Sequence, residues 1–191
     1  MPVPEKNPDL VDNVYDWIEV FVYSVAFVIL LFTFCVRLAV VDGESMTNTL
    51  QDRDILVISN LGYTPSQGDI VVFQSKHYPE PIVKRVIATA GQTVNINFET
   101  WKVTVDGEPV DEAWYVRRDD LMSVMHRGDV SFPHVVPEGC VFCMGDNRNG
   151  STDSRWSSIG DVDTRFVLGH VLLRVFPFDG FGVLPAKNPA A

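Results

Sequence analysis

The feature that most constrains this chain is a long apolar run near its N-terminus. Residues 20–36 contain no charged side chain, and apolar residues continue past the flanking Glu19 and Arg37. About 20 residues, rising roughly 1.5 Å each, are enough for a helix to cross the hydrocarbon layer of a membrane. Residues 17–39 are therefore predicted to form one transmembrane anchor helix, preceded by a short tail at residues 1–16.

Two alternatives to an anchor are a cleaved signal peptide and a buried core helix. A signal peptide has an apolar region of only about 7–15 residues behind a basic start. The start of this chain is acidic, with one lysine against four carboxylates: Lys6 against Glu5, Asp9, Asp12 and Asp16. The run is too uniformly apolar for a core helix. A permanent anchor is the preferred interpretation, although one cation on either side, Lys6 and Arg37, leaves its orientation undetermined by charge.

The texture of the chain changes after the anchor. Short β-branched runs alternate with Gly, Pro, Asn and Asp, and no segment shows a convincing helical period. The predicted strands are residues 54–59, 69–73, 81–89, 93–98, 102–105, 140–144 and 167–175. We expect residues 40–191 to form an all-β, antiparallel, barrel-like domain that folds on itself to hide its sheet edges. A small insertion is expected at about residues 99–136, including a polar, irregular stretch at 114–133.

Charge and cysteine content exclude several classes of protein. The formal net charge of −10 argues against nucleic-acid binding, which requires a basic patch. Cys140 and Cys143 form a C-x-x-C pair, but positions i and i+3 of a strand face opposite sides of a sheet. No second Cys/His pair is present to complete a zinc site. We therefore expect neither a metal nor a cofactor.

Ser45 is the candidate nucleophile, because it lies in the turn Gly43-Glu44-Ser45-Met46 directly after the apolar run. A nucleophile at this place acts on substrates at the membrane face. A serine hydroxyl needs a neighbouring base to react at neutral pH. The histidines, His77, His126, His134 and His170, have no distinctive surroundings. A carboxylate pair, Asp146 with Asp153, fits a polar turn network better than acid–base chemistry.

Lys84 is the third candidate base. In a strand, Ile82, Lys84 and Val86 share one face, so the lysine is expected among apolar side chains. Desolvation there favours the neutral amine and lowers a pKa that starts near 10.4. The alternative is a lysine whose stem packs while its amine reaches water.

A third polar segment, residues 145–155, follows a strongly apolar predicted strand. It is dense in short polar side chains, which is also typical of a solvated surface loop. Asp153 and Arg155 are placed to form a bidentate pair that braces the loop. Ser151 is placed to hydrogen-bond a neutral lysine.

Together these segments resemble the bacterial type I signal peptidases, which are membrane-anchored Ser-Lys proteases. The resemblance runs from the anchor to about Val175. Its motifs, in order, are Gly43-Glu44-Ser45-Met46 with Thr49-Leu50, Gly68-Asp69-Ile70-Val71-Val72-Phe73, Lys84-Arg85-Val86 with Gly91, and Gly145-Asp146-Asn147-Arg148 with Ser151, Asp153-Ser154-Arg155 and Gly160. Four such boxes in order behind an anchor are specific, whereas one alone is weak.

The resemblance implies a role for each matched residue. Ser45 would be the nucleophile and Lys84 its general base. Ser151 would orient the lysine amine, and Asp153 and Arg155 would brace the site. The enzyme would lie in the bacterial plasma membrane and cleave exported preproteins on its extracytoplasmic side. Its partners would be these preproteins and the lipid bilayer, and it would bind no nucleic acid.

The resemblance also implies how substrate binds. A signal peptide would enter as an extended strand beside residues 38–43 and 81–83. Small residues, usually alanine, would occupy the first and third positions before the cut. The substrate-binding residues would be Val41, Asp42, Gly43, Met46, Leu50, Ile82 and Val83.

Two positions depart from the pattern of the family. Many members have proline where Asn48 stands. Some members have serine at the position of Gly43, where its side chain donates to the oxyanion. A glycine at this position resembles the Gram-positive branch of the family. It leaves the backbone N–H of Ser45 as the identified oxyanion donor. A second donor near Gly43 is not identified.

Three other functions remain open. A soluble, self-cleaving Ser-Lys regulator of the same clan is opposed by the anchor and the acidic balance. A peptidase that processes a pilin for conjugation shares the same motifs. A membrane-tethered β domain that only binds export substrates is opposed by the presence of both Ser45 and Lys84. The oligomeric state and the particular preproteins are not determined by the sequence.

Overall fold

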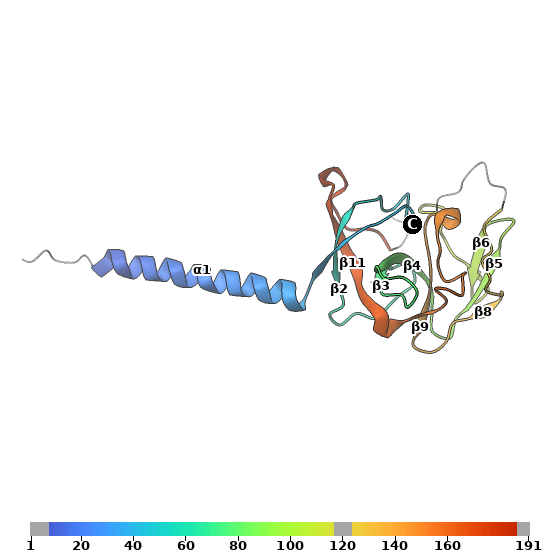
Figure 1. Cartoon of the computed structure of the whole chain (residues 1–191), viewed down its shortest axis with the longest axis horizontal. Helices are drawn as coiled ribbons and strands as arrows, with labels where there is room; N and C mark the ends of the chain where they lie inside the picture. The colour runs from blue at the N-terminus through green and yellow to red at the C-terminus, as the bar shows by residue number, and fades with distance from the viewer. Residues whose placement is uncertain (1–7, 117–123, 187–191) are drawn as a thin grey trace, which may run out of the picture. The chain divides into compact units, whose positions relative to one another are not determined.

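A computed structural model describes residues 8–116 and 124–186 of the chain. The chain divides into two compact units, Met1–Val36 and Arg37–Ala191. The first contains one helix and the second contains all of the described strands (Figure 1).

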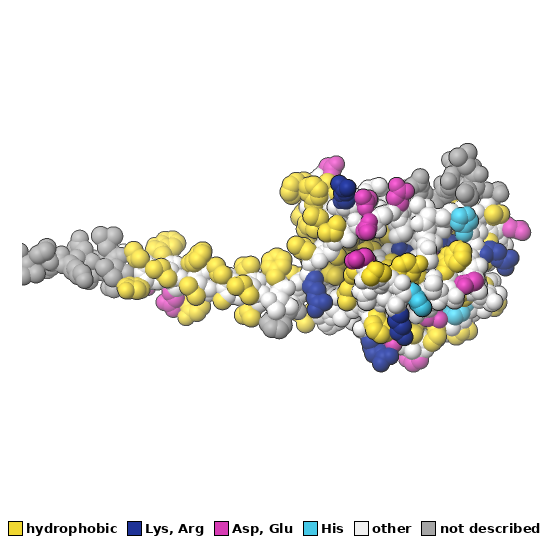
Figure 2. All heavy atoms as spheres, in the orientation of Figure 1, with side chains coloured by type: hydrophobic (Ala, Val, Ile, Leu, Met, Phe, Trp, Pro, Cys, Tyr) yellow, Lys and Arg dark blue, Asp and Glu magenta, His cyan; other side chains and the backbone are white. Residues whose placement is uncertain are grey.

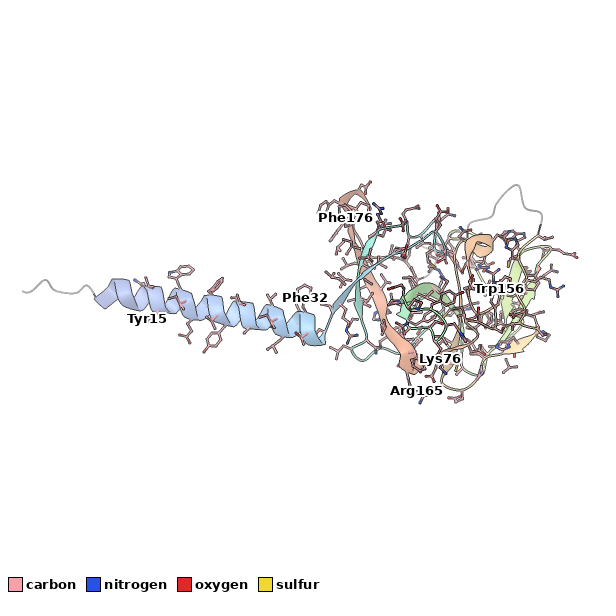
Figure 3. The ribbon with its side chains drawn as sticks, viewed as in Figure 1. Tyr15, Phe32, Lys76, Trp156, Arg165 and Phe176 are labelled. Carbon is pink, nitrogen blue, oxygen red and sulfur yellow. The ribbon has the colours of Figure 1, made fainter. Side chains whose placement is uncertain are left out.

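Helix α1 runs from Pro8 to Phe34 and is long and apolar enough between Asn13 and Thr33 to cross a membrane. Figure 2 shows hydrophobic side chains along the helix, and Tyr15 and Phe32 project from it in Figure 3. Two hydroxyls within the helix, those of Ser24 and Thr33, donate back to carbonyls one turn earlier. This pattern suits apolar surroundings, because no polar group then depends on water.

The helix ends earlier than the predicted boundary at residue 39. Strand β1, Arg37–Val40, begins three residues after Phe34 and pairs with β2 along its whole length. The apolar character of Leu38, Ala39 and Val40 suits a strand as well as a helix, so hydropathy alone placed them in the span.

The larger sheet has seven antiparallel strands in the order β1-β2-β11-β3-β4-β9-β10. Those not yet introduced are β2 (Ile55–Ser59), β3 (Ile70–Phe73), β4 (Ile82–Thr89), β9 (Cys140–Met144), β10 (Val162–Asp163) and β11 (Val167–Phe176). The long strand β11 lies between β2 and β3 in this sheet and pairs with both (Figure 1).

The smaller sheet has four strands in the order β7-β6-β5-β8. They are β5 (Thr93–Asn97), β6 (Lys102–Val105), β7 (Glu108–Pro109) and β8 (His134–Val135). Three short 3₁₀ helices complete the described elements: η1 (Arg148–Gly150), η2 (Thr164–Phe166) and η3 (Phe178–Gly180). The predicted all-β, antiparallel class is confirmed.

All seven predicted strands are present, each within two residues of its expected bounds. The four that the sequence did not indicate, β1, β7, β8 and β10, have two to four residues each, too few to show a period. The stretch predicted to be polar and irregular contributes to the core, because Tyr115, Val116 and Met125 are buried. Residues 117–123 of that stretch lie outside the described residues.

Strand β9 separates two parts of the core. Its residues Phe142 and Met144 pack into a cluster with the smaller sheet, whereas Val141 and Cys143 pack into a cluster with β3 and β4. Cys140 packs against the first cluster and Cys143 lies within the second, and both thiols are free. The prediction that the two cysteines face opposite sides of the sheet is confirmed.

Candidate active site

Ser45 lies in a compact turn between β1 and β2. Gly43 begins the turn with φ +86°, and its N–H donates to Oδ1 of Asp52 at 2.9 Å. Met46 and Leu50 are fully buried and hold the turn against the core cluster that includes Val41. The side chain of Ser45 is left half-buried at the surface of this cluster.

Asn48 explains one departure from the family pattern. Its φ is 64°, in the left-handed region that asparagine tolerates better than most residues. Proline is locked near −65° and cannot adopt this angle. The turn of this chain therefore has a backbone conformation in which asparagine fits and proline does not.

Lys84 reaches the nucleophile from strand β4. It pairs with Val71 of β3, and its neighbours on the same face belong to the cluster that contains Val86 and Cys143. The side chain is 3% exposed. Its Nζ lies 2.7 Å from Oγ of Ser45 and donates to the carbonyl of Val83 at 2.9 Å. The expected apolar setting of the lysine is therefore present, and the amine meets the serine directly.

Burial lowers the pKa of Lys84 from its ordinary value of 10.5 to about 8. Desolvation is the largest cause, because the protonated amine loses its water shell. The negative charge of Asp153 opposes this effect and raises the pKa. A substantial fraction of the amine is neutral near pH 8, as a general base requires.

The segment after β9 ties the nucleophile turn to the rest of the site. The N–H of Asn147 donates to the carbonyl of Ser45 at 3.0 Å, and its side-chain amide donates to the carbonyl of Glu44 at 3.1 Å. The N–H of Gly145 donates to Oδ2 of Asp153 at 3.0 Å. The two hydrogen bonds from Asn147 hold the backbone of the nucleophile turn in place.

Asp153 and Arg155 form the bidentate pair that was predicted. Nε and Nη2 of Arg155 lie 2.8 Å from the two carboxylate oxygens, and both side chains are fully buried. Burial alone would raise the pKa of the Asp153 carboxyl, but the arginine and the N–H of Gly145 outweigh it and hold the pKa below its usual value. The carboxylate therefore stays charged beside Lys84.

No hydrogen bond joins Ser151 to Lys84 among the described residues. Its hydroxyl is buried and has no partner in hydrogen-bonding geometry among the described residues, although it lies close enough to Asp153 to help lower the pKa of that carboxyl. The hydrogen bonds of the Lys84 amine go to Ser45 and Val83 instead. The direct contact of Ser151 with Lys84 is absent from this structure, and a role for Ser151 toward the lysine stays a prediction.

A buried ion pair that the sequence analysis missed lies on the opposite face of β4. Arg85 binds Asp146 with Nε at 2.9 Å and Nη2 at 2.8 Å, and both side chains are buried. Thr49 of the nucleophile turn also donates to this carboxylate. Strand alternation places the side chains of Lys84 and Arg85 on opposite faces of β4. A buried partner for Arg85 could therefore have been suspected from the sequence.

A cleft of about 270 Å³ opens beside the serine and the lysine. Its lining includes five of the seven predicted substrate-binding residues: Val41, Asp42, Met46, Ile82 and Val83. Leu50 is fully buried beneath the turn, and Gly43 is not part of the lining. The rest of the wall is Tyr78–Pro81, of which Pro81 was expected beside the substrate, whereas Tyr78, Pro79 and Glu80 carried no motif and were missed.

The histidines lie in other environments. His134 bonds Asp161 at 2.9 Å, and His170 stacks on Tyr63 with ring centroids 4.1 Å apart. Within residues 8–116 and 124–186, no group of three or more His, Cys, Asp or Glu side chains is arranged to hold a metal ion.

The Lys84 amine is buried and contacts the hydroxyl of Ser45 beside a cleft. This is the arrangement of a serine peptidase that uses a lysine as its base. A profile of the family described as "Signal peptidase, peptidase S26" matches residues 14–176. The chain belongs to this family. It is a signal peptidase I, a protease that cleaves signal peptides.

Relatives of this signal peptidase align with nearly its whole length. The "Probable signal peptidase I-1" of Synechocystis sp. is 32% identical over 96% of this chain and 91% of its own. A signal peptidase I of Bacillus licheniformis is 30% identical over 92% of this chain and 95% of its own. A crystal structure of a signal peptidase I from Enterococcus faecalis is 26% identical, with a TM-score of 0.47 over 56% of this chain and 97% of that chain.

Proposed function

We propose that this protein is a single-pass membrane endopeptidase that removes signal peptides from exported preproteins on the outer side of the plasma membrane. Cleavage would follow small residues in an Ala-x-Ala pattern, with Ser45 as nucleophile and Lys84 as general base. The observation that carries the proposal is the 2.7 Å contact between the serine hydroxyl and a buried amine whose pKa is lowered to about 8.

The reaction proceeds through an acyl-enzyme. The neutral Lys84 amine takes the hydroxyl proton as Oγ of Ser45 attacks the carbonyl carbon of the scissile peptide. The tetrahedral intermediate then collapses, the carbon–nitrogen bond breaks, and the lysine ammonium gives its proton to the leaving amine. In the second half, water attacks the acyl carbon as the lysine accepts one of its protons. The ester bond to Oγ of Ser45 then breaks, and the lysine ammonium returns the proton to Oγ as the new carboxyl group leaves.

The oxyanion would be held by the backbone N–H of Ser45. Among the residues that the structure describes, no acceptor bonds this N–H, so it is free to donate to substrate. A second donor from the turn around Gly43 is part of the proposal. Removing one oxyanion donor costs about 3 kcal/mol of transition-state stabilisation.

The cleft suits a substrate with small side chains. Its walls combine apolar groups from the nucleophile turn, Val41 and Met46, with Ile82 and Val83 at the start of β4. A substrate strand that lies between these walls brings its carbonyl carbon to Ser45. The alanine side chains at the first and third positions would fill shallow apolar contacts on the same side of the substrate strand, because strand residues i and i+2 share one face.

The anchor proposal rests on helix α1. It is long and apolar enough to span a bilayer, and the β domain begins three residues after it ends. A serine only eight residues beyond Arg37 then works close to the membrane surface, where a signal peptide leaves the bilayer. Residues 1–16 would be cytoplasmic.

A reconstituted cleavage assay tests the proposal. The full chain is purified in detergent and mixed with a preprotein that carries an Ala-x-Ala site. Cleavage at that site is measured for wild type, Ser45→Ala and Lys84→Met. The matched controls are Ser66→Ala and Lys76→Met, whose side chains are exposed, with Lys76 visible at the surface in Figure 3.

The two site variants should lose at least a thousandfold in kcat/KM, and the two controls should match wild type. The assignment is wrong if either site variant cleaves at the wild-type rate. A substrate in which leucine replaces both alanines tests the proposed specificity. If this substrate is cleaved at an undiminished rate, the Ala-x-Ala pattern is wrong. The proposal of Ser-Lys chemistry does not depend on that result.

A further inference from the structure

A short segment of the domain links the smaller sheet to the active site. Residues 112–115, which follow strand β7, leave the edge of this sheet and pack against the loop that supports Ser45. We call residues 112–115 the clamp segment. Its side chains contact two buried arginines, Arg148 and Arg85, and none of its residues lines the cleft beside Ser45.

The first contact joins Glu112 to Arg148. Oε1 of Glu112 accepts from Nη1 of the arginine at 3.0 Å, and Oε2 accepts from Nη2 at 2.6 Å. Glu112 is 6% exposed and Arg148 is fully buried. A bidentate pair in such surroundings fixes the guanidinium in one orientation, because both partners are planar and the two bonds are parallel.

Arg148 transmits this orientation to the backbone beside the nucleophile. Its Nε donates to the carbonyl of Gly145 at 3.2 Å, and its own carbonyl accepts from Nη2 of Arg155. Gly145 is packed so tightly that a Cβ placed there would lie 2.5 Å from the carbonyl oxygen of Ser45 and 2.3 Å from Oγ of Ser151. A small displacement of this glycine therefore moves the nucleophile turn.

The second contact joins Tyr115 and Trp114 to Arg85. The guanidinium of Arg85 sits 4.1 Å from the ring centre of Tyr115 and 5.4 Å from that of Trp114. Arg85 directly follows Lys84 and binds Asp146. The clamp segment therefore contacts the neighbours of both the nucleophile and the base.

We propose that Glu112 is a positioning residue of this peptidase, which acts through Arg148 and Gly145 to hold the Ser45 turn at its working distance from Lys84. The proposal rests on the proposed Ser-Lys function. Glu112 touches no substrate and takes part in no proton transfer, so it contributes to the turnover of bound substrate and not to substrate affinity. A displacement of about 1 Å at a reacting centre costs roughly a hundredfold in rate.

The test uses two variants of the full chain in detergent. One is Glu112→Gln, and the other is a double variant that combines Glu112→Met and Arg148→Met. The double variant removes both charges and fills the site with apolar groups, a change that often restores stability to a buried pair. The matched control is Asp163→Asn, which breaks the exposed pair of Asp163 with Arg165, the latter seen at the surface in Figure 3. Each variant is measured for kcat, KM and Tm with an Ala-x-Ala preprotein.

We expect Glu112→Gln to lower kcat by 10- to 100-fold, by the same displacement argument, with KM changed less than about threefold. The double variant should regain the wild-type Tm without regaining kcat, and Asp163→Asn should match wild type in both constants. The inference is overturned if the double variant restores kcat together with Tm, or if a folded Glu112→Gln variant retains kcat within threefold. Either result would reduce the pair to a stabilising contact.

Hydrogen exchange supplies a readout that does not depend on catalysis. Amides in the peptide covering residues 145–155 should exchange at least tenfold faster in Glu112→Gln, whereas those of β2 should not change. Unchanged exchange in residues 145–155 would contradict the proposal. Failure of the Ser-Lys function itself is recognised separately, because Ser45→Ala would then cleave as well as wild type.

Discussion

Nζ of Lys84 lies 2.7 Å from Oγ of Ser45, although the two residues are 39 positions apart in the chain. The serine is fixed by a turn whose apolar side chains, Met46 and Leu50, are buried in one core cluster. The lysine comes from β4, whose same face packs into a different cluster. The contact therefore depends on the relative placement of two separately packed parts of the domain.

The first prediction concerns pH. Lys84 must be neutral to accept the hydroxyl proton, and burial lowers its pKa to about 8. We expect kcat/KM to fall about tenfold for each pH unit below 8 and to level off above it. The measurement is the pH profile of cleavage from pH 5 to 10, with Lys76→Met as a control that should keep the same acidic limb. A flat profile from pH 5 to 9 would contradict a lysine base.

The second prediction concerns stability. The pKa of Lys84 is lower in the folded protein than in the unfolded chain, so stability rises with pH between about 8 and 10.5. Below pH 8 the folded protein carries the full cost of burying the ammonium, about 3 kcal/mol at roughly 1.4 kcal/mol for each pKa unit. Lys84→Met should therefore be inactive but more stable than wild type at pH 7 by up to about 3 kcal/mol.

Denaturant unfolding of the two proteins at pH 7 and pH 10 measures this difference. The advantage of Lys84→Met should shrink toward zero at the higher pH, where the wild-type lysine is neutral in the folded state. Equal stability at pH 7 would mean that the amine is not desolvated as the structure indicates.

The third prediction concerns the nucleophile turn. Asn48 has a φ of 64°, and its side chain is exposed. Asn48→Gly should change stability by less than about 1 kcal/mol, because glycine adopts this angle freely. Asn48→Pro should cost about 3 kcal/mol or more and lower kcat, because proline forces φ to about −65° and displaces Ser45. Thermal unfolding and cleavage rates check both, and a fully active proline variant would contradict this conformation.

The fourth prediction concerns the ion pair of Arg85 with Asp146. Asp146→Asn leaves a buried guanidinium without its charge partner and should destabilise the domain by about 3–5 kcal/mol. Asp163→Asn breaks an exposed pair and should change stability far less, because water screens the two charges. The comparison uses urea unfolding at pH 7, and similar losses for the two variants would mean that the Arg85 pair is not desolvated.

The sequence analysis located much of the domain because strand patterns are local. The β-branched runs around Val71, Lys84 and Phe142 each indicated a strand by composition and alternation. Alternation also placed Lys84 on an apolar face and separated Cys140 from Cys143. The bidentate pair of Asp153 and Arg155 was predictable because the two residues are close in the chain and a carboxylate matches the geometry of a guanidinium.

Contacts between distant segments were not predictable in this way. Nothing near Glu112 indicates that its carboxylate binds Arg148, 36 positions later. The cleft wall at residues 78–80 carries no motif, because a loop becomes part of a site only when another segment lies opposite it. Ser151 was expected to bond Lys84, but its hydroxyl has no hydrogen-bond partner among the described residues, so its role toward the lysine stays a prediction.

The sequence by itself determined the apolar helix and the all-β class, because hydropathy and alternation are properties of short segments. The two residues proposed to react were indicated by the resemblance of four ordered motifs to a known family. The tertiary structure decided the distance between Ser45 and Lys84, the partners of the buried arginines and the lowered pKa of the amine. These depend on which surfaces exclude water from one another, and only the packing of sheets and turns around the site determines that.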